Sequence, residues 1–370
     1  MDFSLSDEQL AIQKTFHDFA EREIRPRARE LDESPQFPRS LVESAGNLGF
    51  FGMRYPEPLG SGADVVSCAL AVEELAWGSL SVAAACTMQA LMGTWFVYRF
   101  GSPELHERLL VPALAGKKIG AICMTEPNAG SDLLSITTSA KETGDRWLIT
   151  GSKTWVTSAP VADFFTVFAR TSPETLGVFL VERGAEGIEL GRPIEKLGLR
   201  SSLTSELHLT DVPATTSLGD PRRGAEYLRE ILAEIRVVTA ALALGVGRAA
   251  YEEAKRYASE RQQFGKPIDR FQAVQEHLAE MATDLEAARR LTHWAAWRSD
   301  QKLPNTREAS MAKLFASEAA NRVCDRAARV TASYGFAAES PIQRYLRDAR
   351  FVLIGGGTSE ILRGNIARES

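Results

Sequence analysis

Hydrophobic and polar residues in the first part of the chain recur with the period of an α-helix. Ser6 and Gln9 have the spacing of a capping box, and one apolar face follows them: Ile12, Phe16, Phe19 and Ile24. Pro26 ends or bends this stretch. Similar patterns predict helices over 37–49, 71–78 and 103–115. We therefore expect an all-helical N-terminal domain over residues 1–118.

The pattern changes at Ile119 to short β-like runs separated by turn residues. These predicted strands cover 119–124, 135–141, 146–150, 164–169, 177–181 and 205–210. Thr143-Gly144-Asp145 supplies a turn for a hairpin between the second and third of them. The pattern predicts a small β-barrel or sandwich as a middle domain over residues 119–218.

Helical patterns return from Ala225 onward. One later stretch keeps an apolar stripe suited to bundle packing: Val274, Leu278, Met281, Leu285 and Ala288. The segment 240–250 is rich in Ala and Gly, which allows another helix or a cofactor to approach closely. We expect a C-terminal four-helix bundle over residues 219–370, and thus an α+β fold that is mostly α.

Composition narrows the class of protein without identifying it. The 370 residues are 44% hydrophobic and 25% charged, enough for a large core. A net charge of -5 without a basic block argues against nucleic acid. We see no signal or transit peptide and no apolar run of membrane-spanning length. The spacing of the cysteines does not suit a metal site, so we expect no bound metal. We expect the thiols to be reduced, in a cytoplasmic protein. The cysteines are Cys68, Cys86, Cys123 and Cys324.

Two short motifs in the middle region are candidates for ligand binding. Thr125-Glu-Pro-Asn-Ala-Gly-Ser-Asp132 follows a predicted strand, and its Gly130 and Ser131 allow a sharp turn that presents N–H groups and a hydroxyl. In Lys153-Thr-Trp-Val-Thr157, an extended backbone places Trp155 and Thr157 on one face. The alternatives are an ordinary turn and a core tryptophan.

Two further motifs lie in the helical C-terminal region. Arg261-Gln-Gln-Phe-Gly-Lys266 offers an arginine suited to phosphate, although a solvated helix end has a similar composition. Arg347-Asp-Ala-Arg350 runs into Ile354-Gly-Gly-Gly-Thr-Ser-Glu360. In order and spacing, the four motifs resemble the flavin-binding landmarks of the acyl-CoA dehydrogenase family, and the resemblance covers nearly the whole chain.

The resemblance implies FAD and assigns residues to it. Trp155 is expected to pack on the isoalloxazine, Thr157 to bind near flavin N5, and Arg261 to reach the FAD of a neighbouring subunit in a homodimer or homotetramer. The implied FAD contacts are Met124, Thr125, Gly130, Ser131, Trp155, Thr157, Arg261, Phe264, Arg329, Thr358 and Glu360.

Two departures from the family pattern affect these assignments. The family often has Gln-x-x-Gly-Gly-x-Gly-Phe where this chain has Arg329-Val-Thr-Ala-Ser-Tyr-Gly-Phe336, so Arg329 replaces a glutamine and two glycines are lost. The family's catalytic base precedes Gly-Thr near the C-terminus, where this chain has Gly356. The resemblance assigns the N–H of Gly356 to the thioester carbonyl.

The second position at which family members carry the catalytic base also lacks a carboxylate in this chain. It aligns with Ile235, directly before Arg236, a residue that the resemblance assigns to the substrate. Glu234 is one position away, which on a helix is a rotation of about 100°. Glu234 is therefore either a weak candidate for the base, acting through a local helix distortion, or a solvent-facing glutamate.

The resemblance implies α,β-dehydrogenation of an acyl thioester, carried by CoA or an acyl-carrier protein, with hydride transfer to flavin N5 and an electron-transferring flavoprotein as a possible acceptor. A substrate with an unusually acidic α-hydrogen, or a base from another loop, would explain the missing glutamate. The alternatives are a flavin-dependent monooxygenase on the same fold and a catalytically silent FAD-binding subunit.

Overall fold

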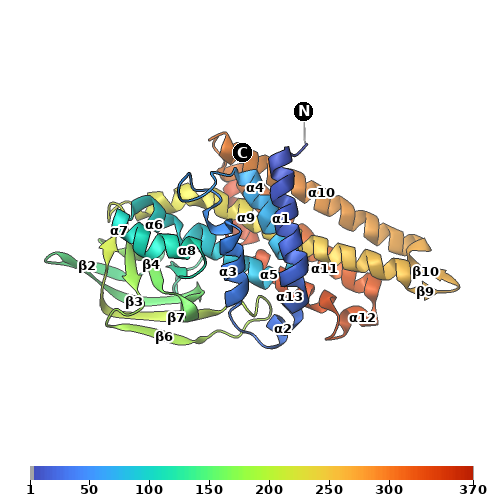
Figure 1. Cartoon of the computed structure of the whole chain (residues 1–370), viewed down its shortest axis with the longest axis horizontal. Helices are drawn as coiled ribbons and strands as arrows, with labels where there is room; N and C mark the ends of the chain where they lie inside the picture. Colours follow the sequence, from blue (N-terminus) through green and yellow to red (C-terminus); the bar gives the residue numbers. More distant parts are fainter. Residues whose placement is uncertain (1–3, 370) are drawn as a thin grey trace.

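The capping box predicted at the start of the chain is formed. In the computed structural model, which describes residues 4–369, the Gln9 N–H donates to Ser6 Oγ and the Ser6 N–H donates to Gln9 Oε1. The helix that follows is the first of the N-terminal region (Figure 1). Its helices are α1 (Asp7–Phe19), α2 (Ala28–Glu33), α3 (Arg39–Asn47), α4 (Val65–Gly78), α5 (Leu80–Met88), α6 (Trp95–Phe100), α7 (Pro103–Leu105) and α8 (Val111–Leu114).

One part of this region corrects the expectation that no apolar run is long enough for a membrane. Within the described residues, the helical stretch Leu80–Phe100 has the length and hydropathy of a span, but 83% of its apolar window is buried inside the protein. Its residues pack in the core of the N-terminal region, against α4 and α9 (Gly224–Glu260). The high hydropathy of this stretch is therefore explained by its position in the protein core.

The middle region is one mixed sheet, which realises the predicted small β domain. Within the described residues its order is β6-β7-β3-β2-β4-β5-β8, and β1 pairs with β4 in parallel. The strands are β1 (Gly120–Cys123), β2 (Ser139–Thr143), β3 (Arg146–Thr157), β4 (Phe164–Arg170), β5 (Leu176–Glu182), β6 (Ile188–Pro193), β7 (Thr204–Pro213) and β8 (Thr216–Ser217). The predicted hairpin joins β2 to β3, with Gly144 at φ +63°.

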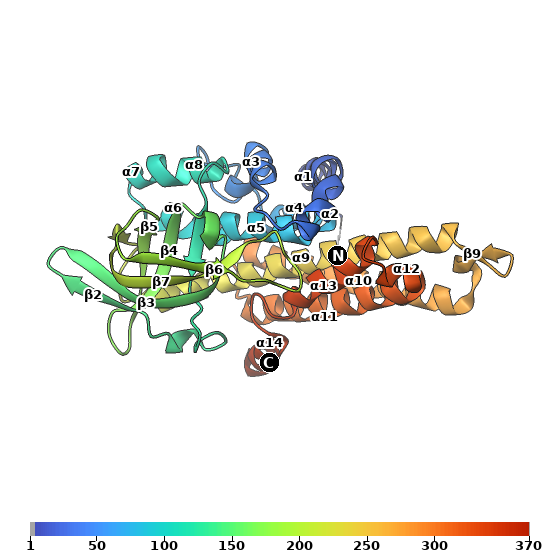
Figure 2. The same cartoon turned by 90° about the horizontal axis from the view of Figure 1, so that it is seen from below.

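Long antiparallel helices form the C-terminal region, as the apolar stripe predicts. They extend away from the sheet and carry a short hairpin at their far end (Figure 2). The elements after α9 are β9 (Gln262–Gln263), β10 (Lys266–Pro267), α10 (Gln272–Asp300), α11 (Thr306–Thr331), α12 (Ser333–Phe336), α13 (Pro341–Val352) and α14 (Ser359–Glu369).

Small residues in α9 allow the close approach that the sequence suggests, and the neighbour is helix α4. A Cβ at Gly245 would lie 2.3 Å from the Glu73 carbonyl oxygen and 2.5 Å from the Ala76 Cβ. This contact joins the N-terminal helices to the bundle through the middle of α9.

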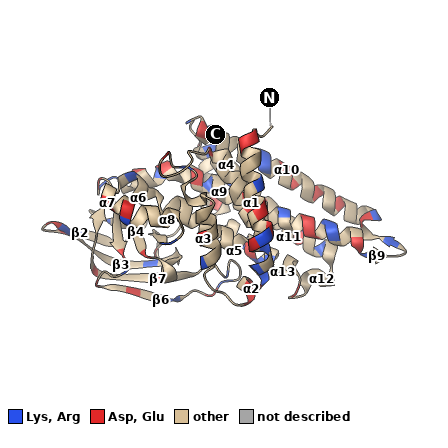
Figure 3. Ribbon diagram, viewed as in Figure 1, with Lys and Arg blue, Asp and Glu red and all other residues tan. Residues whose placement is uncertain are grey.

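Basic and acidic residues are interspersed along the helices. Figure 3 shows Lys or Arg next to Asp or Glu along α1, α10 and α11. In this view the charges do not separate into a broad basic face, in agreement with the net charge of -5.

Candidate active site

A buried ion pair holds the first two motifs together. Lys153 Nζ donates to Glu126 Oε1 at 2.7 Å and to the Met124 carbonyl at 3.1 Å, and both charged side chains are buried. The Thr154 N–H donates to the Thr125 carbonyl at 2.9 Å. The loop after β1 is thereby fixed to β3, and the motifs that the sequence places 20 residues or more apart become neighbours.

Glu126 also organises the far end of the same loop. Its carboxylate accepts from the Thr137 N–H and hydroxyl at 2.6 and 2.8 Å, and from the Thr138 N–H at 2.9 Å. Burial alone raises the pKa of a carboxyl, but the hydrogen bonds from Lys153 and from these threonines outweigh it and bring the pKa of Glu126 to about 2. Glu126 is therefore ionised at neutral pH and anchors the loop that carries Gly130 and Ser131, both exposed.

Trp155 is presented to the outside by a bulge in β3. The pairing of β3 with β7 shifts register between Lys153 and Val156, and Trp155 has φ +56°. The tryptophan side chain is 57% exposed, while Val156 beside it is buried and Thr157 is half-buried. The prediction of an extended backbone that places Trp155 and Thr157 on one face is therefore wrong at Trp155, where a local bulge, and not regular strand alternation, exposes the side chain.

A second group of predicted FAD contacts lies at the far end of the bundle. The Arg261 guanidinium is 5.9 Å from the centroid of the Tyr334 ring, so the third motif lies beside the segment 329–336. Phe264 and Phe336 are 93% and 92% exposed. The β9–β10 hairpin that contains Phe264 projects from the end of the bundle opposite the sheet (Figure 2). One chain therefore does not bring Arg261 and Trp155 together.

Arg329 and Glu360 lie on helices near the surface, and Thr358 directly precedes the helix that carries Glu360. Arg329 is exposed and pairs with Asp325 at 2.8 Å. The Thr358 hydroxyl accepts from the Ile361 N–H at 3.3 Å at the start of α14, and Glu360 is in its exposed first turn. The start of a helix presents free N–H groups, which suits an anionic group of a cofactor.

Gly356 adopts a backbone conformation that favours glycine. Its φ is +72°, and a Cβ at this position would lie 2.7 Å from Thr239 Oγ1. The Thr239 hydroxyl donates to the Ile235 carbonyl at 2.7 Å, which places Gly356 opposite the α9 face that carries Ile235. Within the described residues the Gly356 N–H has no hydrogen-bond acceptor.

Two buried cations lie close to this glycine turn. Lys313 Nζ donates to the Gly357 carbonyl at 2.6 Å, and burial lowers the pKa of Lys313 to about 8. Arg236 lies close enough to lower the pKa of Lys313 further, and its own Nε is buried without a hydrogen-bond partner. Burial also lowers the pKa of Arg236. The site at Gly356 thus has positive charge and a free backbone donor. Glu318 and Glu360 are close enough to raise the pKa of Lys313, and Gly356 itself carries no side chain that could accept a proton.

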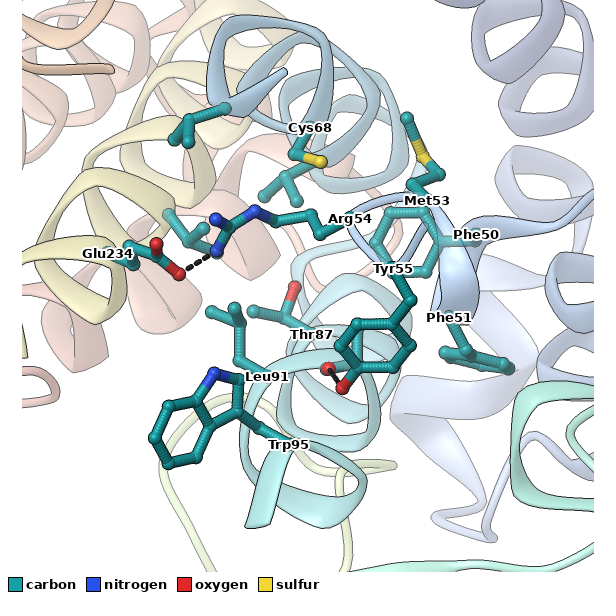
Figure 4. Close-up of a pocket in the computed structure, with 14 residues that line it drawn as sticks. Phe50, Phe51, Met53, Arg54, Tyr55, Cys68, Thr87, Leu91, Trp95 and Glu234 are labelled. Atoms are coloured by element: carbon teal, nitrogen blue, oxygen red, sulfur yellow. Dashed lines mark hydrogen bonds and ion pairs between the residues drawn. The ribbon is translucent and has the colours of Figure 1, made fainter. Parts of the chain in front are cut away.

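Glu234 lies in a neighbouring pocket, where it forms an ion pair with Arg54 (Figure 4). The carboxylate is 19% exposed, so it is neither a solvent-facing glutamate nor a free base. The free space in this pocket is small, about 30 Å³, and lies between the N-terminal helices and α9. Most of its lining is apolar or aromatic: Phe50, Phe51, Met53, Tyr55, Val65, Cys68, Val72, Ala90, Leu91, Trp95 and Val238, with Arg54, Thr87 and Glu234 as its polar members.

The motif analysis missed several residues of the site. Glu126 and Lys153 stand inside the quoted motifs, and an acidic and a basic residue in two motifs that bind one ligand could have suggested a pair. Arg54, Thr239 and Lys313 had no such signal, because only tertiary contacts bring them to the site.

Comparison with known proteins places this geometry in a family. Residues 6–117, 121–212 and 222–370 match the N-terminal, middle and C-terminal domains of acyl-CoA dehydrogenases. The chain belongs to the acyl-CoA dehydrogenase family. Within the described residues, no cluster of His, Cys, Asp and Glu suits a metal ion.

Individual relatives cover the chain from end to end. A benzylmalonyl-CoA dehydrogenase of Aromatoleum aromaticum is 56% identical over 100% of this chain and 99% of the relative. The structure of butyryl-CoA dehydrogenase from Megasphaera elsdenii superimposes with a TM-score of 0.96 at 35% identity, over 100% and 99% of the two chains. PigA with FAD and proline has a TM-score of 0.95 at 29% identity, over 100% and 99%.

The exposed residues of the middle region fit the FAD that this family binds. The Trp155 ring is uncovered at the sheet surface, where a flat ring system would cover it, and Thr157 lies half-buried beside it. The loop from Thr125 to Ser131 offers hydroxyls on a backbone fixed by Glu126. We conclude that the chain is an FAD-dependent oxidoreductase acting on CH–CH groups, of the class that dehydrogenates acyl thioesters.

Proposed function

We propose that the substrate is an acyl-CoA thioester that carries a second carboxylate on its α-carbon, and that loss of CO2 replaces removal of an α-proton. The single observation that carries this proposal is Gly356. The glycine, which the family resemblance aligns with the catalytic base, lies beside two buried cations, and Glu234 is engaged by Arg54. A substrate that generates its own carbanion needs no base at this position.

The relative named benzylmalonyl-CoA dehydrogenase supports the substrate class. A malonyl thioester has its second carboxylate on the α-carbon, and a benzyl substituent supplies the β-carbon and an aromatic ring. In this chain the apolar pocket contains aromatic side chains, among them Phe50 and Trp95, that would pack on such a ring once the pocket opens to admit it. We therefore assign an aromatic malonyl-type thioester to the site.

The proposed reaction balances without an external base. The bond between the α-carbon and the carboxylate breaks, CO2 leaves, and the bonding electron pair remains on the α-carbon as the enolate of the thioester. The β-carbon then loses a hydride, which gives the α,β-unsaturated thioester. When bound, FAD supplies the hydride-accepting N5.

The chain's own residues stabilise the enolate. Negative charge develops on the thioester oxygen, and the free N–H of Gly356 is available to donate to it. Arg236 and Lys313 add positive charge in a site from which most water is excluded, where charge is stabilised more strongly than in bulk water. A backbone donor needs no side chain, so the loss of the glutamate leaves this function intact.

Anaerobic mixing with benzylmalonyl-CoA tests the proposal. We expect flavin bleaching with release of one CO2 for each flavin reduced, and formation of the corresponding unsaturated thioester. Flavin reduction without CO2 would show dehydrogenation by another route and contradict the proposal. Rapid oxygen consumption by the reduced flavin would favour the monooxygenase, and binding of FAD and thioester without any bleaching would favour the silent subunit.

The proposed assembly is at least a homodimer, with electrons passing from reduced FAD to an electron-transferring flavoprotein. Arg261 and Phe264 project from the end of the bundle away from Trp155, and Phe264 is almost fully exposed. A second copy that covers this hairpin would bring its guanidinium to the phosphates of a neighbouring FAD, where an arginine binds in a bidentate manner.

Arg261→Ala is expected to weaken FAD retention about 10- to 100-fold, because a charge-assisted hydrogen bond contributes about 1.5–3 kcal/mol. The measurement is the flavin content after dialysis, with circular dichroism as a check on folding. Arg270→Ala, which removes an exposed arginine from the same hairpin region, is the control. Equal flavin retention in the two variants would remove Arg261 from the FAD site.

A further inference from the structure

Arg54 has more hydrogen-bonding capacity than its surroundings use. Glu234 is its only ion-pair partner within the described residues. Its Nε is buried and has no hydrogen-bond partner, and the hydroxyl of Thr87, in the same pocket, is also buried and unpartnered. A guanidinium has five N–H donors, and an unmet donor in an apolar pocket is costly. The pocket therefore lacks a polar group that a ligand would supply.

Helix α9 places this pocket next to the reacting part of the substrate. Glu234 and Val238 are four residues apart and both line the pocket. Ile235 and Thr239 occupy the adjoining face of α9, and Thr239 meets Gly356. The pocket that holds Arg54 and the Gly356 turn therefore lie at adjoining faces of α9.

Arg54 belongs to a different part of the chain from the cations at Gly356. It follows the short turn 50–52 of the N-terminal region, whereas Arg236 and Lys313 belong to the bundle. Figure 4 shows its side chain reaching across the pocket to Glu234 on α9, with Thr87 and Trp95 on the opposite wall. Arg54 is therefore the cation that faces the pocket interior.

We propose that Arg54 binds the α-carboxylate of the substrate. In the absence of substrate Glu234 is the counter-ion of Arg54, and the substrate carboxylate then accepts some of the guanidinium hydrogen bonds in its place. This inference rests on the proposed function. The Nε–H donor of Arg54, which has no partner within the described residues, is available to a second carboxylate. In the absence of substrate, Glu234 keeps the half-buried Arg54 paired, because an unpaired charge in this pocket would be destabilising. Glu234 is a positioning residue here, and not a base.

Malonyl-CoA and acetyl-CoA form a matched pair of probes, since they differ only by the carboxylate. Neither has a β-carbon that can lose a hydride, so neither can be dehydrogenated. Their dissociation constants are obtained from the perturbation of the flavin absorbance of the holoenzyme, with chromatography to detect any loss of CO2 from malonyl-CoA. We expect tighter binding of malonyl-CoA than of acetyl-CoA by the wild-type protein.

Arg54→Met is expected to weaken malonyl-CoA binding about 10- to 100-fold and to leave acetyl-CoA binding unchanged. Glu234→Gln is expected to bind malonyl-CoA more tightly than wild type, because the competing carboxylate is gone. If Glu234 were the base, the same variant would lose turnover.

The pair Arg99 and Glu230 provides a matched control. It also joins the N-terminal helices to α9, one turn from Glu234, but lies outside the pocket and is 40% exposed on both sides. Arg99→Met should preserve the preference for malonyl-CoA. If Arg54→Met impairs folding, the charge-neutral double variant Arg54→Met/Glu234→Gln takes its place.

A preference for malonyl-CoA that survives the removal of Arg54, or that is absent from the wild-type protein, would overturn the inference. Either result leaves the proposed function open, because CO2 release from benzylmalonyl-CoA is measured separately. The two proposals can also fail separately in the other direction. If Arg54→Met loses the preference for malonyl-CoA but flavin reduction releases no CO2, Arg54 remains the carboxylate site and the decarboxylation is rejected.

Discussion

The double variant Gly356→Glu/Thr239→Ala is expected to dehydrogenate 3-phenylpropionyl-CoA, the decarboxylated counterpart of benzylmalonyl-CoA, about 10²–10⁴-fold faster than the wild-type protein. This thioester has no carboxylate to lose, so the wild-type site must break an α-C–H bond without a base. A glutamate at position 356 would supply a proton acceptor beside an N–H donor that is already in place.

The second substitution is needed because of the local geometry. A side chain at Gly356 would place its Cβ 2.7 Å from Thr239 Oγ1, and Thr239→Ala removes that oxygen. The φ of +72° adds a cost of about 1–2 kcal/mol for a residue other than glycine, so part of the gain in rate is lost to strain. The single variant Gly356→Glu is therefore expected to be the weaker enzyme.

Anaerobic stopped-flow measurement of flavin bleaching gives the rate for each variant. Thr239→Ala alone and the isosteric Gly356→Gln/Thr239→Ala are the controls, and both should remain as slow as the wild-type protein. The active double variant should also bind benzylmalonyl-CoA more weakly, since two carboxylates would then share one site. A double variant that binds 3-phenylpropionyl-CoA but leaves the flavin oxidised would mean that position 356 is not the site of proton removal.

The fold could be predicted because the apolar residues of each region recur with a single period, either that of a helix or that of a strand. The helical faces after Ser6, the β-like runs from Ile119 and the apolar stripe ending at Ala288 all correspond to elements of the structure. Strands β6 and β8 were missed, since β6 has a partly exposed pattern of mixed residues and β8 has two residues. Short or weakly patterned strands are fixed by their neighbours in the sheet more than by their own sequence.

The candidate site was predictable only where a motif is local. The motifs around Thr125 and Trp155 were recognised from contiguous residues, but the sequence did not reveal that a bulge turns Trp155 outward. The role of Glu234 depends on Arg54, which is 180 residues earlier in the chain and has no motif around it. Pairings of this kind depend on how helices from different regions pack, and helical periodicity does not specify them.

The other large effect is expected from Lys153→Met, which should yield a folded protein that retains little FAD. Removal of one partner from a buried ion pair costs about 3–5 kcal/mol, because the remaining charge loses its compensation. Here that charge is the Glu126 carboxylate, which holds the loop of Thr125, Gly130 and Ser131 against β3. If the cost falls on the FAD-binding conformation of this loop, FAD affinity decreases about 10²–10³-fold.

Flavin content after gel filtration and FAD titration of the apoprotein measure this effect, with circular dichroism to establish that the helices remain. Lys141→Met removes an exposed lysine from β2, in the same sheet, and should retain FAD. The charge-neutral Glu126→Gln/Lys153→Met should recover part of the affinity, since the introduced amide oxygen would still accept from Thr137 or Thr138 without leaving a buried charge. Wild-type FAD affinity in Lys153→Met would show that the loop forms without the ion pair. Its order would then come from the remaining contacts, in which Thr154 donates to the Thr125 carbonyl and Thr137 and Thr138 donate to Glu126.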